Sequence, residues 1–132
     1  MLVDEGWGNG DARVRLAQLQ GALLRECRLI VGLREHTQNM SVEAATQFFV
    51  QNAFIAAAPA QREALRGTAD PLYGYYTLGK LELLKLRDDY KRLAGSRYSL
   101  ADFHDRLLSR GDPPIAIARK NLLGADDDGK LF

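Results

Sequence analysis

Two long segments of the chain repeat their apolar residues at the spacing of an α-helix, and this pattern limits the fold more than any other feature. The first segment runs from about residue 12 to 35 and the second from about residue 71 to 94. Apolar residues three or four positions apart share one face of a helix, so each segment predicts an amphipathic helix. No segment alternates apolar and polar residues with the period of two that is typical of a half-buried strand. The sequence therefore predicts an all-α fold.

Capping residues divide the rest of the chain into shorter helices. Asp11, Ser41 and Ser99 have side chains that commonly cap a helix N-terminus, and Gly95 suits the left-handed position after a helix. We expect about five to six helices, with the two long ones packed against the shorter ones. Because 132 residues are enough to bury a core, we expect a single domain over residues 1–123, followed by a flexible acidic tail over residues 124–132.

The charge balance and the apolar runs exclude several kinds of partner. The chain has 18 basic and 17 acidic side chains and a formal net charge of +1, which gives no bulk attraction for nucleic acid or an anionic membrane. No apolar run approaches the roughly 20 residues that a membrane span needs. The first residues also lack the basic and apolar regions of a signal peptide. We therefore expect neither nucleic acid nor a membrane as a partner.

The chain offers few side chains for holding a metal. Cys27 is its one cysteine, which excludes an internal disulfide and a thiolate zinc site. His36 and His104 are its two histidines, and neither has a second histidine or a carboxylate at metal-ligand spacing on the same helical turn. Zinc sites normally use three or four protein ligands. For this chain alone we expect no cofactor.

Two clusters have both a structural and a functional interpretation. Arg28 shares the first long segment with other arginines, which favours a solvated or interface-lining face, with phosphate or carboxylate binding as the alternative. Tyr73, Tyr75 and Tyr76 cluster at the start of the second long segment. Aromatic residues at this spacing usually belong to a core, but one phenol could face a cleft and donate to a developing oxyanion.

A series of short motifs follows along the chain: Asp4-Glu-Gly-Trp-Gly, Arg28-Leu-Ile-Val, His36-Thr, Tyr76-Thr-Leu-Gly-Lys80 with Leu86-Arg87, and Phe103-His-Asp. Their order and spacing, from about Arg13 to Leu123, resemble the C-terminal landmarks of the domain-of-unknown-function family 885. Members of that family are bacterial, largely helical and similar to zinc metallopeptidases of the gluzincin type. The resemblance therefore implies metallopeptidase-like hydrolase activity for the full-length bacterial protein. Its compartment, cytoplasm or periplasm, stays open at the level of the sequence.

The resemblance also implies roles for particular residues. Glu5 would supply the third metal ligand of the full-length family fold, which binds zinc. Arg28, His36 and Tyr76 would line the substrate cleft, with His36 and Tyr76 stabilising the tetrahedral intermediate. In this chemistry zinc polarises the peptide carbonyl while a glutamate on an upstream helix activates the attacking water.

The chain departs from the family pattern at its beginning. The upstream His-Glu-x-x-x-His-like helix is absent from the sequence, and Asn9-Gly10-Asp11 stands where the family continues with a helical Tyr-Ala-Glu stretch. We therefore expect a truncated C-terminal part without hydrolytic activity of its own. One alternative is a helical interaction module that self-associates or recruits a protein partner over its apolar face. Another is one half of a metallopeptidase assembled from two chains.

Overall fold

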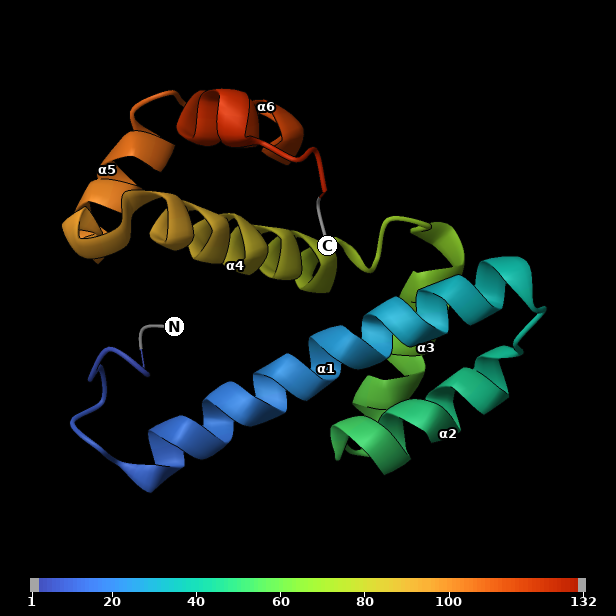
Figure 1. Cartoon of the computed structure of the whole chain (residues 1–132). Coiled ribbons are helices and arrows are strands. Elements are labelled where there is room, and N and C mark those ends of the chain that lie inside the picture. Colours follow the sequence, from blue (N-terminus) through green and yellow to red (C-terminus); the bar gives the residue numbers. More distant parts are fainter. Residues whose placement is uncertain (1–2, 131–132) are drawn as a thin grey trace. The chain divides into compact units, whose positions relative to one another are not determined.

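The structure, a computed structural model, describes residues 3–130, and the regular structure in that part of the chain is helical (Figure 1). The elements in order are α1 (Ala12–Thr37), α2 (Val42–Ala53), α3 (Ala57–Ala69), α4 (Tyr75–Ala94), the 3-10 turn η1 (Gly95–Arg97), α5 (Leu100–Leu108), α6 (Ile115–Leu123) and the 3-10 turn η2 (Gly124–Asp126). The prediction of an all-α fold with five to six helices is confirmed. Within residues 3–130 no helix has both the length and the apolar character of a membrane span.

The capping side chains begin their helices as predicted. Asp11 accepts a hydrogen bond from the backbone N–H two residues on, at 2.8 Å. The hydroxyls of Ser41 and Ser99 accept from backbone N–H groups three residues on, at 3.2 and 3.0 Å. Gly95 has a φ of +56°, the left-handed conformation expected after α4. These helix ends are thus set by local side-chain chemistry.

The second long helix begins at Tyr75, later than the predicted residue 71. Asp70 accepts from the backbone N–H of Leu72 at 3.1 Å and holds the next residues in a turn. The turn brings Gly74 against α1, where an added Cβ would lie 2.4 Å from a leucine side-chain carbon. This close approach fixes the turn, because any larger residue would push it away from α1.

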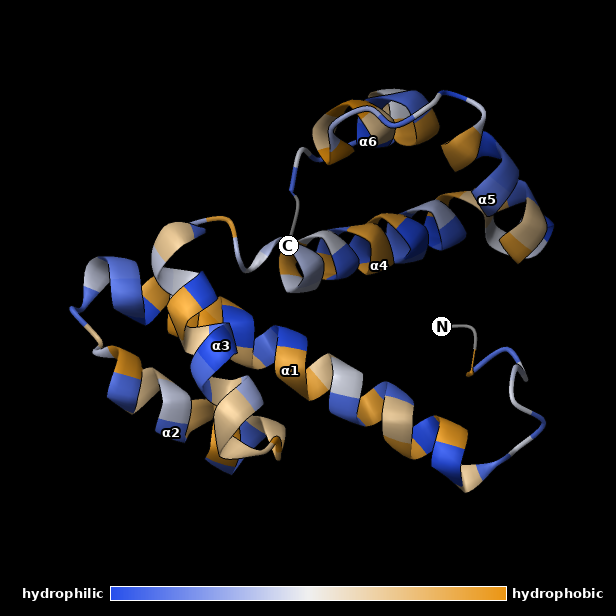
Figure 2. Cartoon of the chain, turned by 180° about the vertical axis from the view of Figure 1, so that it is seen from behind, coloured by the Kyte–Doolittle hydropathy of each residue, from blue (hydrophilic) through white to orange (hydrophobic). Residues whose placement is uncertain are grey.

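The chain divides into two compact units, residues 1–77 and 78–132, and each unit is described by itself. The single domain expected over residues 1–123 stays a prediction. In the first unit α1, α2 and α3 each contact the other two. Figure 2 shows hydrophobic residues on all three helices. The buried core consists of Cys27, Val31, Ala45, Phe49, Ala53, Ala60, Ala64 and Tyr73. Small alanines on α2 and α3 allow these helices to approach closely around Phe49.

The second unit has a core of its own. It consists of Leu86, Tyr90, Phe103, Ala118 and Leu123, from α4, α5 and α6. The rings of Tyr90 and Phe103 lie 5.9 Å apart between centroids, a favourable aromatic distance. The tail expected to be flexible begins with η2, and the aspartates that follow it contact Arg119 of α6.

Candidate functional site

Residues 67–76 run back along α1, and this strip contains three of the four residues singled out by the resemblance. Its course from the C-terminal end of α1 towards the middle of α1 is defined by three contacts: Gly67 with His36, Tyr73 with Arg28, and Tyr76 with Arg25. We call residues 25–36 of α1 together with residues 67–76 the α1 strip. Arg28, His36 and Tyr76 therefore lie along one face of α1, although 48 positions separate the first and last of them in the sequence (76 minus 28).

Arg28 is held in a closed network. Its Nε and Nη2 donate to the two carboxylate oxygens of Glu63 at 2.7 and 2.8 Å, a bidentate pair with side chains only 13% and 19% exposed. Hydrogen bonds from Arg28 hold the pKa of Glu63 below its ordinary value. The Tyr73 hydroxyl donates to the same carboxylate and to the Glu63 carbonyl. Arg28 is thus fixed in orientation, with Nη1 as the terminal nitrogen outside the Glu63 pair.

Tyr73 lies between two guanidinium groups. The Cζ atoms of Arg28 and Arg66 are 5.3 and 5.4 Å from the centroid of its ring, within the range of cation–π attraction. Its side chain is buried, and burial together with the Glu63 carboxylate raises the pKa of its phenol. Tyr73 is therefore the tyrosine of the cluster that belongs to the core, which bears out the structural interpretation for this residue.

His36 and Tyr76 have different surroundings on the same strip. His36 Nε2 lies 2.9 Å from the carbonyl oxygen of Gly67. Because a carbonyl oxygen can only accept, Nε2 carries the proton and Nδ1 is the nitrogen that can accept one. Tyr76 is 57% exposed, and the guanidinium of Arg25 lies over its ring at 5.7 Å. The Tyr76 phenol is accessible, whereas the His36 Nε2–H is occupied by the end of α3.

Glu5 does not belong to a group of three potential metal ligands in residues 3–130. It is exposed in a turn-rich segment before α1 in which Gly6 and Gly8 have positive φ angles. A zinc site needs three or four protein ligands. Among residues 3–130 no three His, Cys, Asp or Glu side chains are grouped so that they could hold a metal ion. The residues described here therefore do not fit zinc by themselves.

Glu35 is a further charged residue of the α1 strip, and the sequence reasoning missed it. Both carboxylate oxygens are buried without a hydrogen-bond partner. They lie against Gly67, where an added Cβ would be 2.3 Å from Oε2. Burial raises the pKa of this carboxyl, an effect that His36 partly offsets. The one sequence signal is its position four residues after the buried Val31, which sets Glu35 on the buried face of α1.

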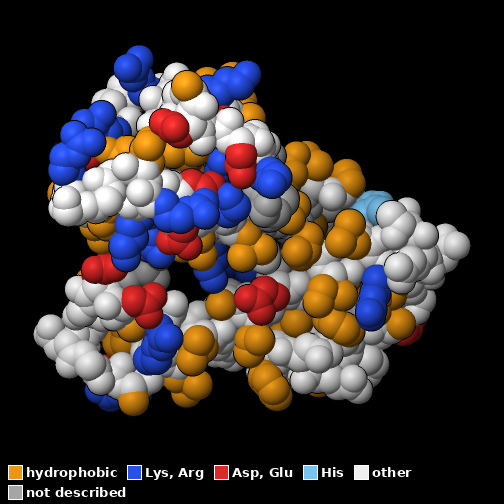
Figure 3. Space-filling view, viewed as in Figure 1, with side chains coloured by type: hydrophobic (Ala, Val, Ile, Leu, Met, Phe, Trp, Pro, Cys, Tyr) orange, Lys and Arg blue, Asp and Glu red, His pale blue; other side chains and the backbone are white. Residues whose placement is uncertain are grey.

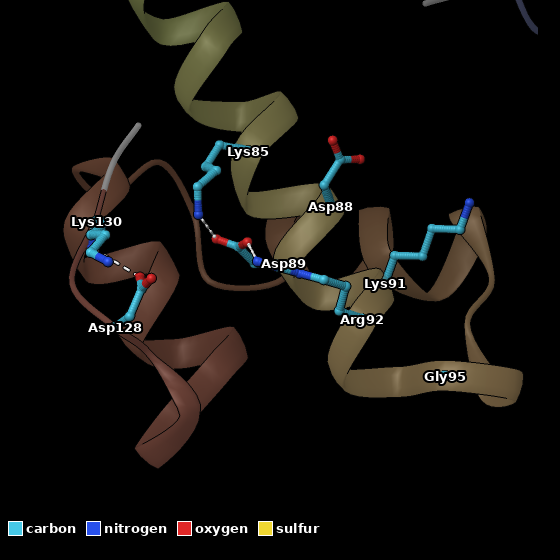
Figure 4. A pocket seen from close by; sticks show the side chains of 8 residues that line it. All are labelled: Lys85, Asp88, Asp89, Lys91, Arg92, Gly95, Asp128 and Lys130. Atoms are coloured by element: carbon cyan, nitrogen blue, oxygen red, sulfur yellow. Dashed lines mark hydrogen bonds and ion pairs between the residues drawn. The ribbon is translucent and has the colours of Figure 1, made fainter.

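The second unit has a charged cluster of another kind beside α4. A hollow of about 780 Å³ is lined mainly by lysine, arginine and aspartate side chains (Figure 4). Lys85 and Arg92 reach the carboxylate of Asp89 from two sides, and Arg119 donates to it at 2.8 Å. Burial would raise the pKa of Asp89, but these hydrogen bonds outweigh burial and hold the pKa at about 2.

Arg119 extends this cluster to the tail. Its side chain is 1% exposed, and it donates to Asp127 at 3.0 Å and to Asp128 at 3.1 Å. Each charge around Arg119 therefore has an opposite charge within hydrogen-bond distance. An arrangement so fully paired stabilises the tail against α4 and α6 rather than offering free groups to a ligand.

A family model described as "Bacterial protein of unknown function (DUF885)" matches residues 1–122. No curated protein and no solved structure matches the chain.

Proposed function

Because the chain belongs to the family of bacterial proteins of unknown function DUF885, we propose that it is the C-terminal helical part of a zinc-metallopeptidase-like protein. We further propose that it has no hydrolytic activity of its own. The observation that supports the first proposal is the α1 strip, which brings Arg28, His36 and Tyr76 onto one face of α1.

The length of the strip suits a short stretch of extended peptide. Arg28 and His36 are eight residues apart on α1, which corresponds to about 12 Å along a helix axis. An extended chain covers that length with three to four residues, at about 3.4 Å each. Arg28 would contact substrate through the terminal amino group that Glu63 leaves unused, while Tyr76 would donate its phenolic proton to a developing oxyanion.

The interaction of His36 with the Gly67 carbonyl limits how His36 could stabilise an oxyanion. For Nε2–H to stabilise an oxyanion, the bond to the Gly67 carbonyl must open. Otherwise His36 would act through a protonated Nδ1, which requires the imidazolium form. Zinc belongs to the proposal only for the full-length family fold, since Glu5 is the one implied ligand among these residues.

Zinc content and peptide hydrolysis test the proposal together. The purified chain is assayed by metal analysis and with an unstructured peptide pool, alongside Glu5→Ala and, as a matched control, Glu26→Ala, another exposed glutamate. We expect no stoichiometric zinc and no cleavage in any of the three. One tightly bound zinc per chain, with cleavage abolished by Glu5→Ala and preserved in Glu26→Ala, would contradict the proposal. Cleavage that appears only on mixing with a chain carrying a His-Glu-x-x-x-His helix would establish the two-chain alternative.

An exposed apolar stripe on α1 favours self-association as a second candidate function. The stripe consists of Leu16, Leu19, Leu23, Ile30 and Leu33, and all but the half-buried Leu23 are exposed. Their spacing follows a heptad, and the stripe borders the buried Cys27, which is four residues after Leu23 on α1. Figure 3 shows hydrophobic side chains exposed over the surface of the unit that contains α1.

Light scattering after size-exclusion chromatography tests this second candidate. If two copies pair through the stripe, the chain elutes as a dimer and Ile30→Lys converts it to a monomer. Leu108→Lys, at an exposed leucine of α5, is the control that leaves the dimer intact. A monomer at high concentration would contradict self-association.

A further inference from the structure

A second hollow in residues 78–132 has an apolar wall and a charged wall. It has a volume of about 620 Å³ and lies among the C-terminal half of α4, η1, α5 and α6. Leu93, Ala94 and Leu122 supply the apolar wall. Leu93 is 43% exposed, so this wall presents hydrocarbon to the solvent that fills the hollow. Volumes of this size are typical of sites for small organic ligands.

The polar wall is held in position by a hydrogen-bonded group. The hydroxyl of the buried Tyr90 donates to Asp102 Oδ2 at 2.5 Å. Arg106 Nε donates to both Asp102 oxygens, at 2.9 and 3.0 Å. The Asp102 carboxylate is therefore already satisfied and already neutralised by one guanidinium. Asp102 therefore does not favour a cationic ligand in this hollow.

Cationic donors remain on the same wall. In residues 3–130 the guanidinium of Arg97 has neither a hydrogen bond nor an ion pair, whereas Arg106 uses Nε for Asp102 and also interacts with the Tyr90 hydroxyl. Two arginines and one aspartate give the wall a net charge of +1. Guanidinium groups bind carboxylates through paired N–H donors, so this wall suits one carboxylate.

We propose that this hollow binds a monoanionic carboxylate carried on an apolar group. The carboxylate lies against Arg97, with Arg106 adding positive charge on the same wall, and the apolar group packs on Leu93 and Leu122. The site uses only residues between 90 and 122, and it is independent of the α1 strip and of any metal. A peptide ending in an aliphatic residue and a fatty acid share this chemistry.

Titrations of the full chain followed by amide NMR shifts test the proposal with three probes. N-acetyl-L-leucine and octanoate represent the two sources of the carboxylate, and N-acetyl-L-leucinamide is the uncharged control. We expect at least one of the two acids to shift amides around Leu93, Arg97 and Leu122, with a Kd on the order of 1 mM for so open a site. The uncharged amide should bind at least fivefold more weakly. Binding of one acid alone identifies which source the site takes.

Substitutions localise the interaction. Arg97→Gln should weaken binding about fivefold or more, because it removes a charged donor, and it should not disturb the fold, because Arg97 has no partner in residues 3–130. Arg62→Gln, at an exposed arginine of α3, is the matched control and should leave the Kd unchanged. Leu93→Ala should weaken the binding of octanoate.

Two results would overturn the proposal. One is that neither acid shifts the amide NMR signals around the hollow at about 10 mM, ten times the expected Kd. The other is binding that is equally strong for N-acetyl-L-leucinamide and unchanged by Arg97→Gln. Neither result bears on the α1 strip, since the zinc and hydrolysis assays do not involve these residues.

Discussion

Glu35 in the first unit and Asp89 in the second are buried carboxylates with opposite surroundings. The Glu35 oxygens have no hydrogen-bond partner and its pKa is raised. Asp89 accepts from Lys85, Arg92 and Arg119, and its pKa is lowered to about 2. Burial disfavours a charge unless hydrogen bonds from cations outweigh it. Asp89 is thus a buried charge that stabilises its unit, whereas Glu35 is a buried charge that destabilises its unit.

The largest effect is expected at the centre of the paired cluster. Arg119→Met removes the buried cation shared by Asp89, Asp127 and Asp128, and should reduce the free energy of unfolding by about 3–5 kcal/mol. Urea unfolding measured by circular dichroism, with hydrogen exchange of the α6 amides, reports the loss in this unit. Arg110→Met, at an exposed arginine just after α5, is the control. A loss below about 1 kcal/mol would show that the cluster is dispensable.

Low pH should remove the stabilisation that Asp89 and its cationic partners give the second unit. Since the folded-state pKa of Asp89 is about 2 and its ordinary value is 3.8, the stabilisation is present above pH 3.8 and is lost as the pH falls towards 2. Its size is on the order of 2 kcal/mol. The unfolding free energy measured by urea titration across this range should fall in the wild type and fall less in Asp89→Asn. Asp88→Asn, at the exposed neighbour, should keep the wild-type slope.

The first unit also has a well-paired carboxylate, and Tyr73 tests its contribution. Tyr73→Phe removes the hydroxyl that donates to Glu63 and should cost about 1.5 kcal/mol, the scale of a hydrogen bond to a charged group. Tyr76→Phe, at an exposed ring three residues on, should change stability by less than about 0.5 kcal/mol. Equal effects in thermal or urea unfolding would contradict the distinction between the two tyrosines.

The smallest expected effect has the opposite sign. Because the pKa of Glu35 is raised above its ordinary 4.5, its contribution to stability is favourable below pH 4.5 and is lost as the pH rises through the folded-state pKa. Glu35→Met should therefore stabilise the chain by about 1 kcal/mol at neutral pH, since no buried carboxylate remains unpaired. Glu26→Met, at an exposed position of α1, is the control. A loss of stability in Glu35→Met at neutral pH would indicate that Glu35 has a partner in solution.

Much of the fold could be predicted from the sequence because helices form from local interactions. Periodic apolar residues and the side chains of Asp11, Ser41 and Ser99 gave the helices and three of their beginnings. The start of α4 could not be predicted in the same way, because Asp70 can cap a turn as well as a helix. The contact of Gly74 with Leu29 of α1 favours the turn over the helix, and Leu29 lies 45 positions earlier in the sequence.

For the candidate site, too, some features followed from the sequence and others only from the tertiary structure. The sequence by itself determined the helical class, the family landmarks and the identities of Arg28, His36 and Tyr76 as residues of interest. Only the tertiary structure decided that Glu63 holds Arg28, that Gly67 occupies His36, and that Glu35 is buried without a partner. The physical reason is that burial and pairing depend on which distant segment packs against a helix, whereas helix formation depends on neighbours within a turn.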